Sequence, residues 1–460
     1  MNLNKDIFRK YDIRGLADVD FIGDFPFALG KAFGYYLSKH NFDGKLAVSG
    51  DVRPSTKRLK KEFISGVLRA GIDVIDIGIL PTPTNYFSNY YFSDASVQIT
   101  GSHNPTEYNG FKFTVEKKPF FGSQIIELYK IMLENKLNNL PVKKSTLEHI
   151  NILPNYAEDI IKRINIKKNI NVIMDCGNAA GSIIAPEIFK KIGLNLTELF
   201  CEVDGNFPNH HPDPTVDSNL EVIIEKIKKD KKYDIGIAYD GDADRVVCID
   251  SVGNIIRSDI LMCIFIKDIM PKIKNKKIIY DVKCSSAIRD VIIDNGGIPI
   301  EWSTGHSLIK NKMKQEKASF GGEFSGHIFF ADKYYGYDDA IYVSLRIIEI
   351  LSNTNKKLED LVKEIPKYKS TPEIRLECDS DKIKFEIMES IKEYFMEKYD
   401  CSDIDGVKIY FENGWGLLRA SNTQPIIVCR IEAKSDNELK KIKDTITDKL
   451  SEYEGIKIEL

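Results

Sequence analysis

The sequence predicts an α/β protein made of three related α/β domains with mixed, largely parallel sheets, followed by a smaller C-terminal α+β domain. A chain of 460 residues is too long for a single hydrophobic core. Strands and helices alternate in three successive rounds, which is typical of α/β units, and the order of the elements changes near the C-terminus. We place the domains at residues 1–150, 151–255, 256–368 and 369–460.

The first round shows the alternation most clearly. We expect helices at 25–39 and 59–68, and strands at 45–50, 72–77 and 95–99. The second helix stops at Gly71, because glycine readily ends a helix. The last strand ends before a polar loop, because Gly101 and Pro105 forbid its continuation.

The second and third rounds repeat this order, and each presents polar loops after its strands. We expect a helix near 155–164, a strand at 171–175, a helix around 218–230, a strand at 235–239, a helix at 258–270, strands at 277–282 and 299–302, and an apolar helix at about 338–352. The proline-rich loop 204–214 is expected to cross the surface near a site. The repeat rests on the order of the elements and not on residue-level similarity.

The C-terminal segment differs from these rounds. We expect a strand at 373–377, a helix near 380–397, a hairpin around 413–416, a strand at 427–431 and a final helix. Strands and a hairpin packed with two helices predict a small α+β domain.

The composition excludes several classes of function. The chain is 43% apolar and 29% charged, and its 65 Lys and Arg nearly balance its 68 Asp and Glu, so no global basic field predicts a nucleic-acid partner. No apolar run is long enough for a signal-peptide core or a membrane span. The eight cysteines show no metal-ligand spacing. We expect a soluble, cytoplasmic protein with reduced thiols.

The loop from Thr100 to Pro105 is the first candidate for chemistry. It places Ser102 beside His103 at a strand end, where a serine can act as a nucleophile or a phosphate carrier. The alternative is an ordinary turn in which the small polar side chains bond their own backbone.

A second candidate is the loop that carries Asp240, Asp242 and Asp244 after a strand. An extended backbone would aim the three carboxylates the same way, and Mg²⁺ is the cation that suits a few hard oxygen ligands. Arg245 is placed to bind a phosphate. The alternatives are a solvated acidic turn or a calcium loop, although the sequence does not fit an EF-hand.

Two further loops combine polar groups. The stretch from Arg419 to Pro425 joins one cation to short hydrogen-bonding side chains, as in an anion-binding nest or an ordinary polar turn. Glu323, Ser325 and His327 alternate, so an extended run would point them to one side. His327 is then either an acid or base or a structural histidine.

Taken together, these loops carry a resemblance that spans nearly the whole chain. The sequence resembles the α-D-phosphohexomutase superfamily, and most closely its phosphomannomutase/phosphoglucomutase branch. The motifs, in family order, are Tyr11-Asp12-Ile13-Arg14-Gly15, Thr100 to Pro105, Asp240 to Arg245, Thr304-Gly305-His306-Ser307, Glu323 to His327, and Arg419 to Pro425.

The resemblance implies four domains around a central cleft and a role for each motif. Catalytic roles fall to Ser102 as the phosphoserine and to His103, Lys112, Arg14, Arg245 and His327. Mg²⁺ is expected on Asp240, Asp242, Asp244 and an oxygen of phospho-Ser102. Substrate-binding roles fall to Tyr11, Lys283, Thr304, Gly305, His306, Glu323, Ser325, Arg419, Ser421, Asn422 and Thr423.

The implied activity is a Mg²⁺-dependent transfer of a phosphoryl group between O1 and O6 of mannose or glucose phosphate. It would proceed through phospho-Ser102 and a hexose 1,6-bisphosphate, which is both intermediate and activator. The partners are then small hexose phosphates, with neither nucleic acid nor membrane, and the protein is a monomer or a dimer. The mannose or glucose preference stays open, because Phe324 stands where this branch often has Met.

Three alternatives remain beside this interpretation. A phosphoglucosamine mutase is disfavoured, because that branch has Gln at the position of Phe324. The loop 240–244 could instead supply an aspartyl nucleophile to a Mg²⁺-dependent sugar phosphatase. The third alternative is a catalytically silent sugar-phosphate-binding protein.

Overall fold

The computed structural model of the protein describes residues 3–134, 144–421 and 425–458. It divides into two compact units: unit 1 comprises Met1–Ser258 and Ser325–Leu361, and unit 2 comprises Asp259–Phe324 and Val362–Leu460. Both units combine helices with sheets of the predicted kinds, so the α/β fold class with an α+β C-terminal part is confirmed. The four domain boundaries and the central cleft stay predictions.

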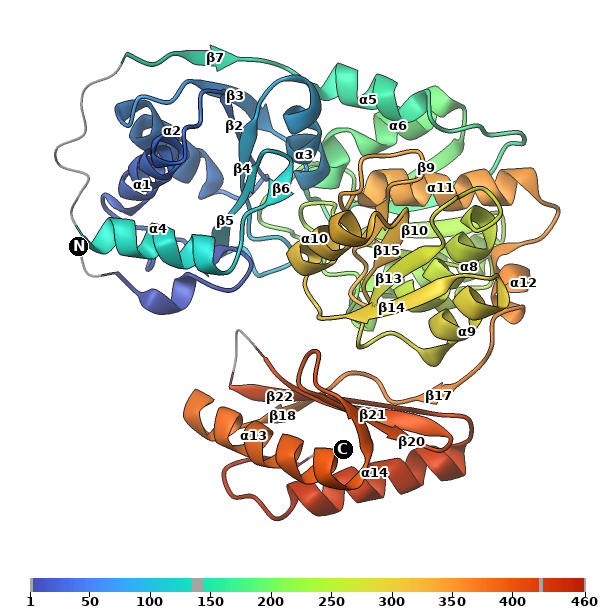
Figure 1. Ribbon diagram of the computed structural model, residues 1–460. Helices are drawn as coiled ribbons and strands as arrows, with labels where there is room; N and C mark the ends of the chain where they lie inside the picture. The colour runs from blue at the N-terminus through green and yellow to red at the C-terminus, as the bar shows by residue number, and fades with distance from the viewer. Residues whose placement is uncertain (1–2, 135–143, 422–424, 459–460) are drawn as a thin grey trace. The chain divides into compact units, whose positions relative to one another are not determined.

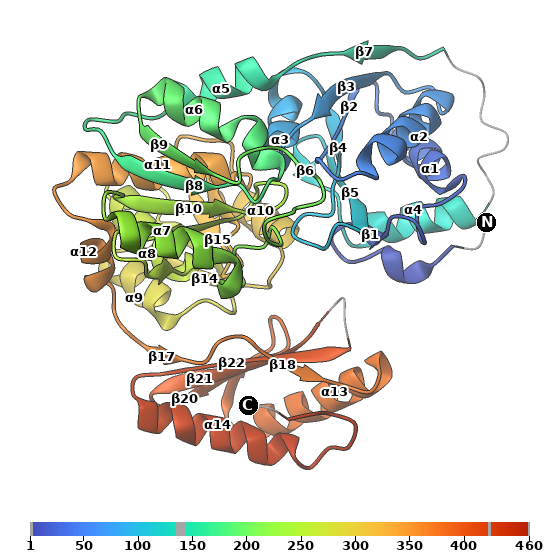
Figure 2. The same cartoon turned by 180° about the vertical axis from the view of Figure 1, so that it is seen from behind.

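The first sheet of unit 1 and its helices fill the segment up to residue 149. Its elements are η1 (Lys5–Ile7), β1 (Ile13–Leu16), α1 (Phe25–Lys39), β2 (Leu46–Gly50), α2 (Thr56–Arg69), β3 (Val74–Ile79), α3 (Thr82–Tyr91), β4 (Ala95–Ile99), β5 (Tyr108–Val115), β6 (Lys118–Pro119), α4 (Ser123–Leu133) and β7 (Leu147–His149). The strand order is β1-β5-β4-β2-β3-β7. Strands β4, β2, β3 and β7 run parallel, whereas β5 and β1 pair antiparallel at one side. Helices α1 and α2 cover one face and α3 covers the other (Figures 1 and 2).

The core of this segment explains why its helices pack so closely. Phe33, Phe63 and Phe111 are fully buried between the helix pair and the sheet, and each such side chain contributes about 1.5–3 kcal/mol by burial. A Cβ at Gly30 would lie 2.1 Å from the carbonyl oxygen of Phe63, so only glycine lets α1 approach α2 this closely.

The second sheet of unit 1 has the same mixed character. Its elements are α5 (Leu153–Ile161), β8 (Asn171–Asp175), η3 (Ala180–Ile183), α6 (Ala185–Ile192), β9 (Asn195–Leu199), η4 (Asp217–Leu220), α7 (Glu221–Asp230), β10 (Ile235–Tyr239), β11 (Val246–Ile249) and β12 (Ile255–Ile256). Strands β9, β8 and β10 are parallel, and β11 and β12 continue the sheet antiparallel. The segment Ser325–Leu361 also belongs to unit 1 and contains β16 (Ile328–Phe330), which is not part of this sheet, and α11 (Ala340–Asn353), which packs on β11.

Unit 2 contains a parallel sheet and an antiparallel sheet. The first comprises α8 (Ser258–Ile269), which begins at the unit boundary, β13 (Lys277–Asp281), α9 (Ser286–Asp294), β14 (Ile298–Trp302), α10 (His306–Glu316) and β15 (Phe320–Gly322). Strand β13 pairs in parallel with both β14 and β15. Helix α12 (Leu358–Lys363) crosses the second boundary.

The antiparallel sheet forms the C-terminal part of unit 2. Its elements are β17 (Lys369–Ser370), β18 (Ile374–Glu377), α13 (Asp381–Lys398), β19 (Asp400–Ser402), β20 (Val407–Phe411), β21 (Gly414–Ala420), β22 (Ile426–Ala433) and α14 (Asp436–Leu450). Both α13 and α14 cover the same face of this sheet (Figures 1 and 2). The indole of Trp415 projects from the sheet into a cluster with Val282 and Leu417.

Some strands were missed from the sequence, whereas the cysteines agree with expectation. The antiparallel strands β1, β5 and β11 were not predicted. In β5, polar residues such as Asn109 and Lys112 interrupt the apolar pattern of a strand that is buried along most of its length. All eight cysteines are free thiols, and no helix among the described residues is long and apolar enough to cross a membrane.

Candidate active site

The serine loop follows directly from β4, as the sequence predicts. Ser102 is 3% exposed and has a φ of 51°, a left-handed conformation that costs a non-glycine residue about 1–2 kcal/mol. Its N–H donates to Thr100 Oγ1 at 2.8 Å. Its Oγ lies 3.1 Å from Asp240 Oδ2 and 3.1 Å from Nδ1 of His103. The hydroxyl is therefore fixed against the acidic loop at the end of β10.

The acidic loop brings its three carboxylates together, but not in the predicted way. The backbone forms a tight turn with Ala243 at a φ of 57° and its N–H bonded to the Asp240 carbonyl at 3.0 Å, so the expectation of an extended run is wrong. One oxygen each of Asp240, Asp242 and Asp244 still lie within 4.8 Å of one another. The turn accomplishes this because it curls the side chains around one point.

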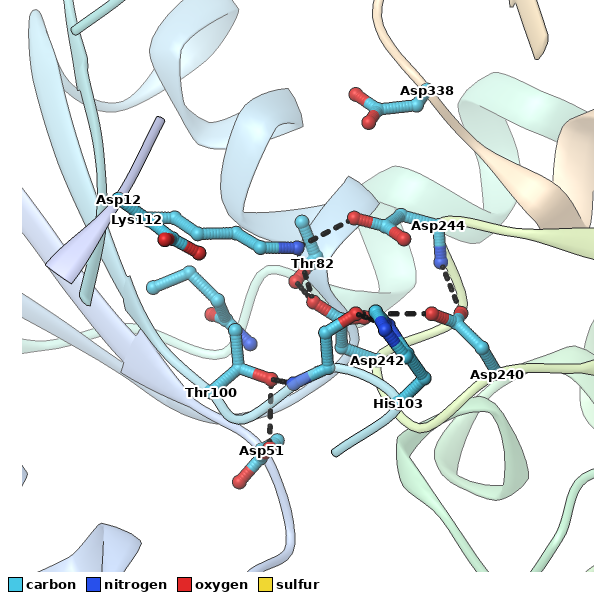
Figure 3. A network of polar contacts seen from close by, with 12 residues as sticks. Asp12, Asp51, Thr82, Thr100, His103, Lys112, Asp240, Asp242, Asp244 and Asp338 are labelled. Atoms are coloured by element: carbon cyan, nitrogen blue, oxygen red, sulfur yellow. Dashed lines mark hydrogen bonds and ion pairs between the residues drawn. The ribbon is translucent and has the colours of Figure 1, made fainter. Parts of the chain in front are cut away.

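A lysine from the neighbouring strand closes this cluster. Nζ of Lys112, on β5, donates to Asp242 Oδ2 at 2.8 Å and to Asp244 Oδ2 at 2.6 Å (Figure 3). Thr82, the first residue of α3, donates from Oγ1 to the same Asp242 oxygen at 2.5 Å. Thr82 was not predicted as a site residue, although it follows a strand end in the sequence as the other site loops do.

The buried charges shift one another's pKa. Burial, together with repulsion from Asp244 and Asp242, raises the pKa of Asp240 well above its ordinary value. Burial opposes the shift at Asp242, but attraction to Lys112 outweighs it and lowers the pKa of that carboxyl. Burial likewise opposes the shift at Lys112, whose pKa is raised by Asp242 and Asp244. Three carboxylates thus face one lysine at close range, and a further cation would relieve their repulsion.

The donor set fits a small, hard metal ion. Lys112 and Thr82 bond the Oδ2 atoms, whereas Oδ1 of Asp242 and Oδ1 of Asp244 are buried and receive no hydrogen bond from the residues that the structure describes. A buried carboxylate oxygen without a donor is costly unless a cation meets it. Oxygen-only ligands with few protein donors suit Mg²⁺.

Cations and histidines surround the serine. Arg14, on β1, donates from Nη1 to the Gly101 carbonyl at 3.2 Å and from Nη2 to Asp12 at 2.5 Å. Burial and the nearby Arg245 and Arg14 lower the pKa of His103 well below its ordinary value, so its ring is neutral at pH 7.

The other histidine predicted to be catalytic, His327, has a neighbour at each of its ring nitrogens. Arg245 Nε donates to its Nε2 at 2.9 Å, and its Nδ1 lies 3.0 Å from Asp338 Oδ2. The expectation that residues 323–327 form an extended run is wrong, because they form a turn with Gly326 at a φ of 105°. The turn nevertheless brings His327 to Arg245, next to the acidic loop.

Unit 2 holds most of the predicted substrate-binding residues. Glu323 Oε1 accepts the Gly305 N–H at 2.5 Å, which joins two of the motifs. Arg419 Nε donates to Asp405 Oδ2 at 3.1 Å, and the Thr304 N–H donates to the same oxygen at 3.1 Å. Arg419 and Thr304 therefore meet at the Asp405 carboxylate, and the next residue, Gly305, is bonded to Glu323.

The remaining predicted residues are distributed over both units. Lys283 Nζ donates to Glu373 Oε2 at 3.0 Å, His306 is the first residue of α10, and Ser421 bonds Ile426 across the end of the β21–β22 pair. In unit 1, Tyr11 and Ser325 are half-buried. Asn422 and Thr423 lie outside the described residues.

Comparison with protein families identifies matches along the chain. Four domains described as phosphoglucomutase/phosphomannomutase match it: α/β/α domain I at residues 5–139, domain II at 154–253, domain III at 257–368 and the C-terminal domain at 354–449.

Individual relatives agree with these matches. A phosphomannomutase/phosphoglucomutase of Pseudomonas putida is 40% identical over 454 residues, covering 98% of this chain and 97% of the relative. A phosphomannomutase of Methanocaldococcus jannaschii is 34% identical over 98% of both chains. The crystal structure of a phosphoglucomutase/phosphomannomutase family protein from Burkholderia thailandensis superposes with a TM-score of 0.91 at 34% identity, again over 98% of both chains.

Proposed function

Because the chain belongs to the phosphoglucomutase/phosphomannomutase family, and is therefore an enzyme of the isomerase class, we propose that it interconverts the 1- and 6-phosphates of mannose or glucose through a phosphorylated Ser102. The observation that carries the proposal is the position of Ser102 Oγ, 3.1 Å from Asp240 Oδ2 at the edge of a buried cluster of three aspartates. A phosphate on this oxygen would meet both the predicted cation and the surrounding arginines and lysine.

Charge neutralisation is the main contribution of the chain to phosphoryl transfer. The transferring group spreads negative charge over three oxygens, and stabilisation of that charge dominates catalysis of this kind. Arg14, Lys112 and Arg245 are the cations around Ser102, and the first two are less than a tenth exposed. Their burial strengthens each interaction, because little water screens it.

Asp240, Asp242 and Asp244 would hold Mg²⁺ together with an oxygen of phospho-Ser102. When bound, Mg²⁺ withdraws charge from the phosphoryl oxygens as a Lewis acid. The buried Oδ1 atoms of Asp242 and Asp244 support this assignment, because they receive no hydrogen bond from the described residues.

The proposed cycle has two balanced transfers. The hexose hydroxyl oxygen bonds to the phosphorus of phospho-Ser102, the bond from phosphorus to Ser102 Oγ breaks, and the hydroxyl proton passes to a base. The resulting hexose 1,6-bisphosphate reorients, Ser102 Oγ bonds to the phosphorus of its other phosphate, the bond from that phosphorus to the sugar oxygen breaks, and the base returns the proton to the sugar oxygen. Of the three candidates for the base, which are His103, Lys112 and His327, His103 is the one hydrogen-bonded to Ser102 Oγ.

Most of the residues proposed to recognise the substrate belong to unit 2, whereas Ser325 belongs to unit 1. Arg419 and Ser421, with Asn422 and Thr423, would bind the phosphate that is not reacting, and Glu323 with Ser325 would bind sugar hydroxyls. Because the first four residues would bind the phosphate and not the sugar ring, they would accept the bisphosphate in either orientation, as the cycle requires.

The test is an assay of the purified protein on glucose 1-phosphate, mannose 1-phosphate and glucosamine 1-phosphate in parallel, with Mg²⁺ and a trace of the matching 1,6-bisphosphate. We expect the 6-phosphates of glucose or mannose to form without release of inorganic phosphate. Preferred turnover of the glucosamine ester would replace the substrate assignment. Release of phosphate without isomerisation would indicate a phosphatase, and binding with neither reaction would indicate a silent sugar-phosphate-binding protein.

A further inference from the structure

One buried arginine outside the predicted site bonds several backbone carbonyls of the serine loop. Arg53 is 2% exposed and lies just after β2. Because β2 and β4 are adjacent parallel strands, paired from Leu46 with Ala95 to Gly50 with Ile99, their carboxyl ends meet at one edge of the sheet. The turn after β2 therefore lies beside the loop after β4.

The guanidinium of Arg53 collects the carbonyl groups of that loop. Nη2 donates to the carbonyls of Ser102 at 2.7 Å and Asn104 at 2.5 Å. Nη1 donates to the carbonyls of Tyr108 at 3.0 Å and Pro105. Three carbonyl oxygens of the serine loop and that of Tyr108, the first residue of β5, thus converge on a single planar side chain, whose fork of N–H groups suits them.

Asp51 completes the arrangement from the same turn. Its Oδ2 accepts from Arg53 Nε at 3.0 Å, from Thr100 Oγ1 at 2.7 Å and from the Gly101 N–H at 3.2 Å. Thr100 Oγ1 is the acceptor for the Ser102 N–H. Figure 3 shows Asp51 beneath Thr100, on the side of the loop away from Asp240. The carboxylate and the guanidinium together bond the backbone on both sides of Ser102.

Arg53 is packed closely against the serine loop. A Cβ at Gly101 would lie 2.5 Å from Cζ of Arg53, so the loop rests directly on the guanidinium. The guanidinium also packs over the ring of Phe207, whose centroid lies 5.2 Å from Cζ. Ser102 keeps its left-handed φ of 51° in this setting, and such a conformation persists only when its surroundings determine it.

We propose that Arg53 is a positioning residue for phosphoryl transfer: its guanidinium, oriented by Asp51, fixes the backbone from which Ser102 Oγ reaches the acidic cluster. The inference rests on the proposed function, because it presupposes that Ser102 carries the phosphate. Arg53 bonds backbone carbonyls and not the reacting atoms, so its loss displaces the phosphate carrier and leaves substrate-binding groups in place. A displacement of about 1 Å can cost about 100-fold in rate.

The experiment compares Arg53→Ala and Arg53→Lys with a matched control, Arg346→Ala. Arg346 is another fully buried arginine of unit 1, and its guanidinium bonds a carboxylate, Asp332, and the hydroxyl of Tyr342. The readouts are kcat and KM at saturating Mg²⁺ and bisphosphate, the single-turnover loss of phosphate from phospho-Ser102, and kcat with guanidinium added at a non-denaturing concentration.

We expect kcat and the single-turnover rate of both Arg53 variants to fall about 10- to 100-fold with KM changed less than about threefold. Lysine keeps the charge but cannot reach four carbonyls, so Arg53→Lys should stay impaired. Guanidinium should restore kcat of Arg53→Ala at least threefold, while Arg53→Lys and Arg346→Ala do not respond. If Arg53→Ala does not fold, the kcat and single-turnover rate of Arg53→Lys decide.

The proposal is overturned if the Arg53 variants keep kcat within about threefold of Arg346→Ala, or if KM rises in place of the fall in kcat. Failure of the proposed function looks different, because Ser102→Ala would then retain full activity. An inactive Ser102→Ala together with active Arg53 variants refutes the positioning role alone.

Discussion

The acidic cluster of unit 1 and the substrate-binding residues of unit 2 are both rich in buried charge, but they are held in different ways. In unit 1 the site groups hold one another: Lys112 bonds Asp242 and Asp244, and Ser102 bonds Asp240. In unit 2 each predicted cation is paired with a carboxylate outside the predicted site, Arg419 with Asp405 and Lys283 with Glu373.

This difference predicts how substitutions behave. Where site groups position one another, removing one disturbs all of them, so effects fall on the rate and are not additive. Where a separate carboxylate holds each cation, removing the cation leaves its neighbours in place. Changes in unit 1 should therefore lower kcat, and changes in unit 2 should mainly raise KM.

Ser102→Ala should have the largest effect. Loss of the phosphate carrier removes the reaction path, so kcat should fall by more than about 10³-fold. The hydroxyl makes two hydrogen bonds and fills little volume, so the variant should fold and keep its thermal unfolding temperature. Steady-state assay and thermal unfolding of the same preparation check both statements, and substantial activity would refute the carrier role.

Asp242→Asn should follow, with effects on both rate and metal requirement. The amide keeps the shape but removes the charge that pairs with Lys112 and the proposed Mg²⁺. We expect kcat to fall about 100-fold and half-maximal activity to need at least about tenfold more Mg²⁺. A Mg²⁺ titration measures both.

The control for this change is Asp217→Asn, which removes an exposed carboxylate of the same unit. It should titrate like the wild type. An Asp242→Asn enzyme with wild-type kcat and Mg²⁺ dependence would contradict the metal assignment.

Arg419→Ala tests the other side of the comparison. We expect KM for the hexose phosphate to rise about 10- to 100-fold, because a charged hydrogen bond to phosphate is lost, while kcat changes less than about threefold. The matched control is Arg289→Ala, which removes an exposed arginine of unit 2. A fall in kcat at unchanged KM would show that unit 2 behaves like unit 1.

The smallest effect concerns stability and a carboxyl of unit 1 outside the reaction. Burial raises the pKa of Asp339 to about 6, against the bonds it accepts from Tyr342, Tyr334 and Tyr156. The folded state then holds the proton more tightly than the unfolded state, so this contribution to stability is full below pH about 4 and is lost as pH rises through about 6.

Asp339→Asn removes that titration and keeps a residue suited to the N-cap of α11. Between pH 5 and 7 the free energy of unfolding of the wild type should therefore decrease by about 1 kcal/mol more than that of the variant. Urea unfolding of both proteins at the two pH values measures the difference. An identical pH dependence would contradict the raised pKa.

Elements with a clean periodicity could be predicted from the sequence, because local spacing determines them. Helix α1 was expected at 25–39 and spans Phe25–Lys39, and β4 was expected and found at 95–99. The acidic loop was expected after a strand, as found, but its turn was not predicted. Ala243 has a left-handed φ, and alanine is not a residue type that indicates one.

Long-range partners explain most of what the sequence did not reveal. No role was predicted for Asp51 and Arg53, because their contact with the serine loop depends on the pairing of β2 with β4, 49 residues further along the chain. Thr82 and Asp338 were missed for the same reason: each reaches the site through the packing of a separate element.

The most direct test of the central claim is to follow the phosphate itself. The purified protein is phosphorylated with labelled hexose 1,6-bisphosphate, and the labelled residue is identified by peptide mass spectrometry. The labelled protein is then mixed with excess unlabelled hexose phosphate in a rapid-quench experiment. We expect one phosphate on Ser102, lost within a single turnover and recovered on the sugar. Label on an aspartate of the loop 240–244, or label on Ser102 that stays on the protein during turnover, would contradict the account.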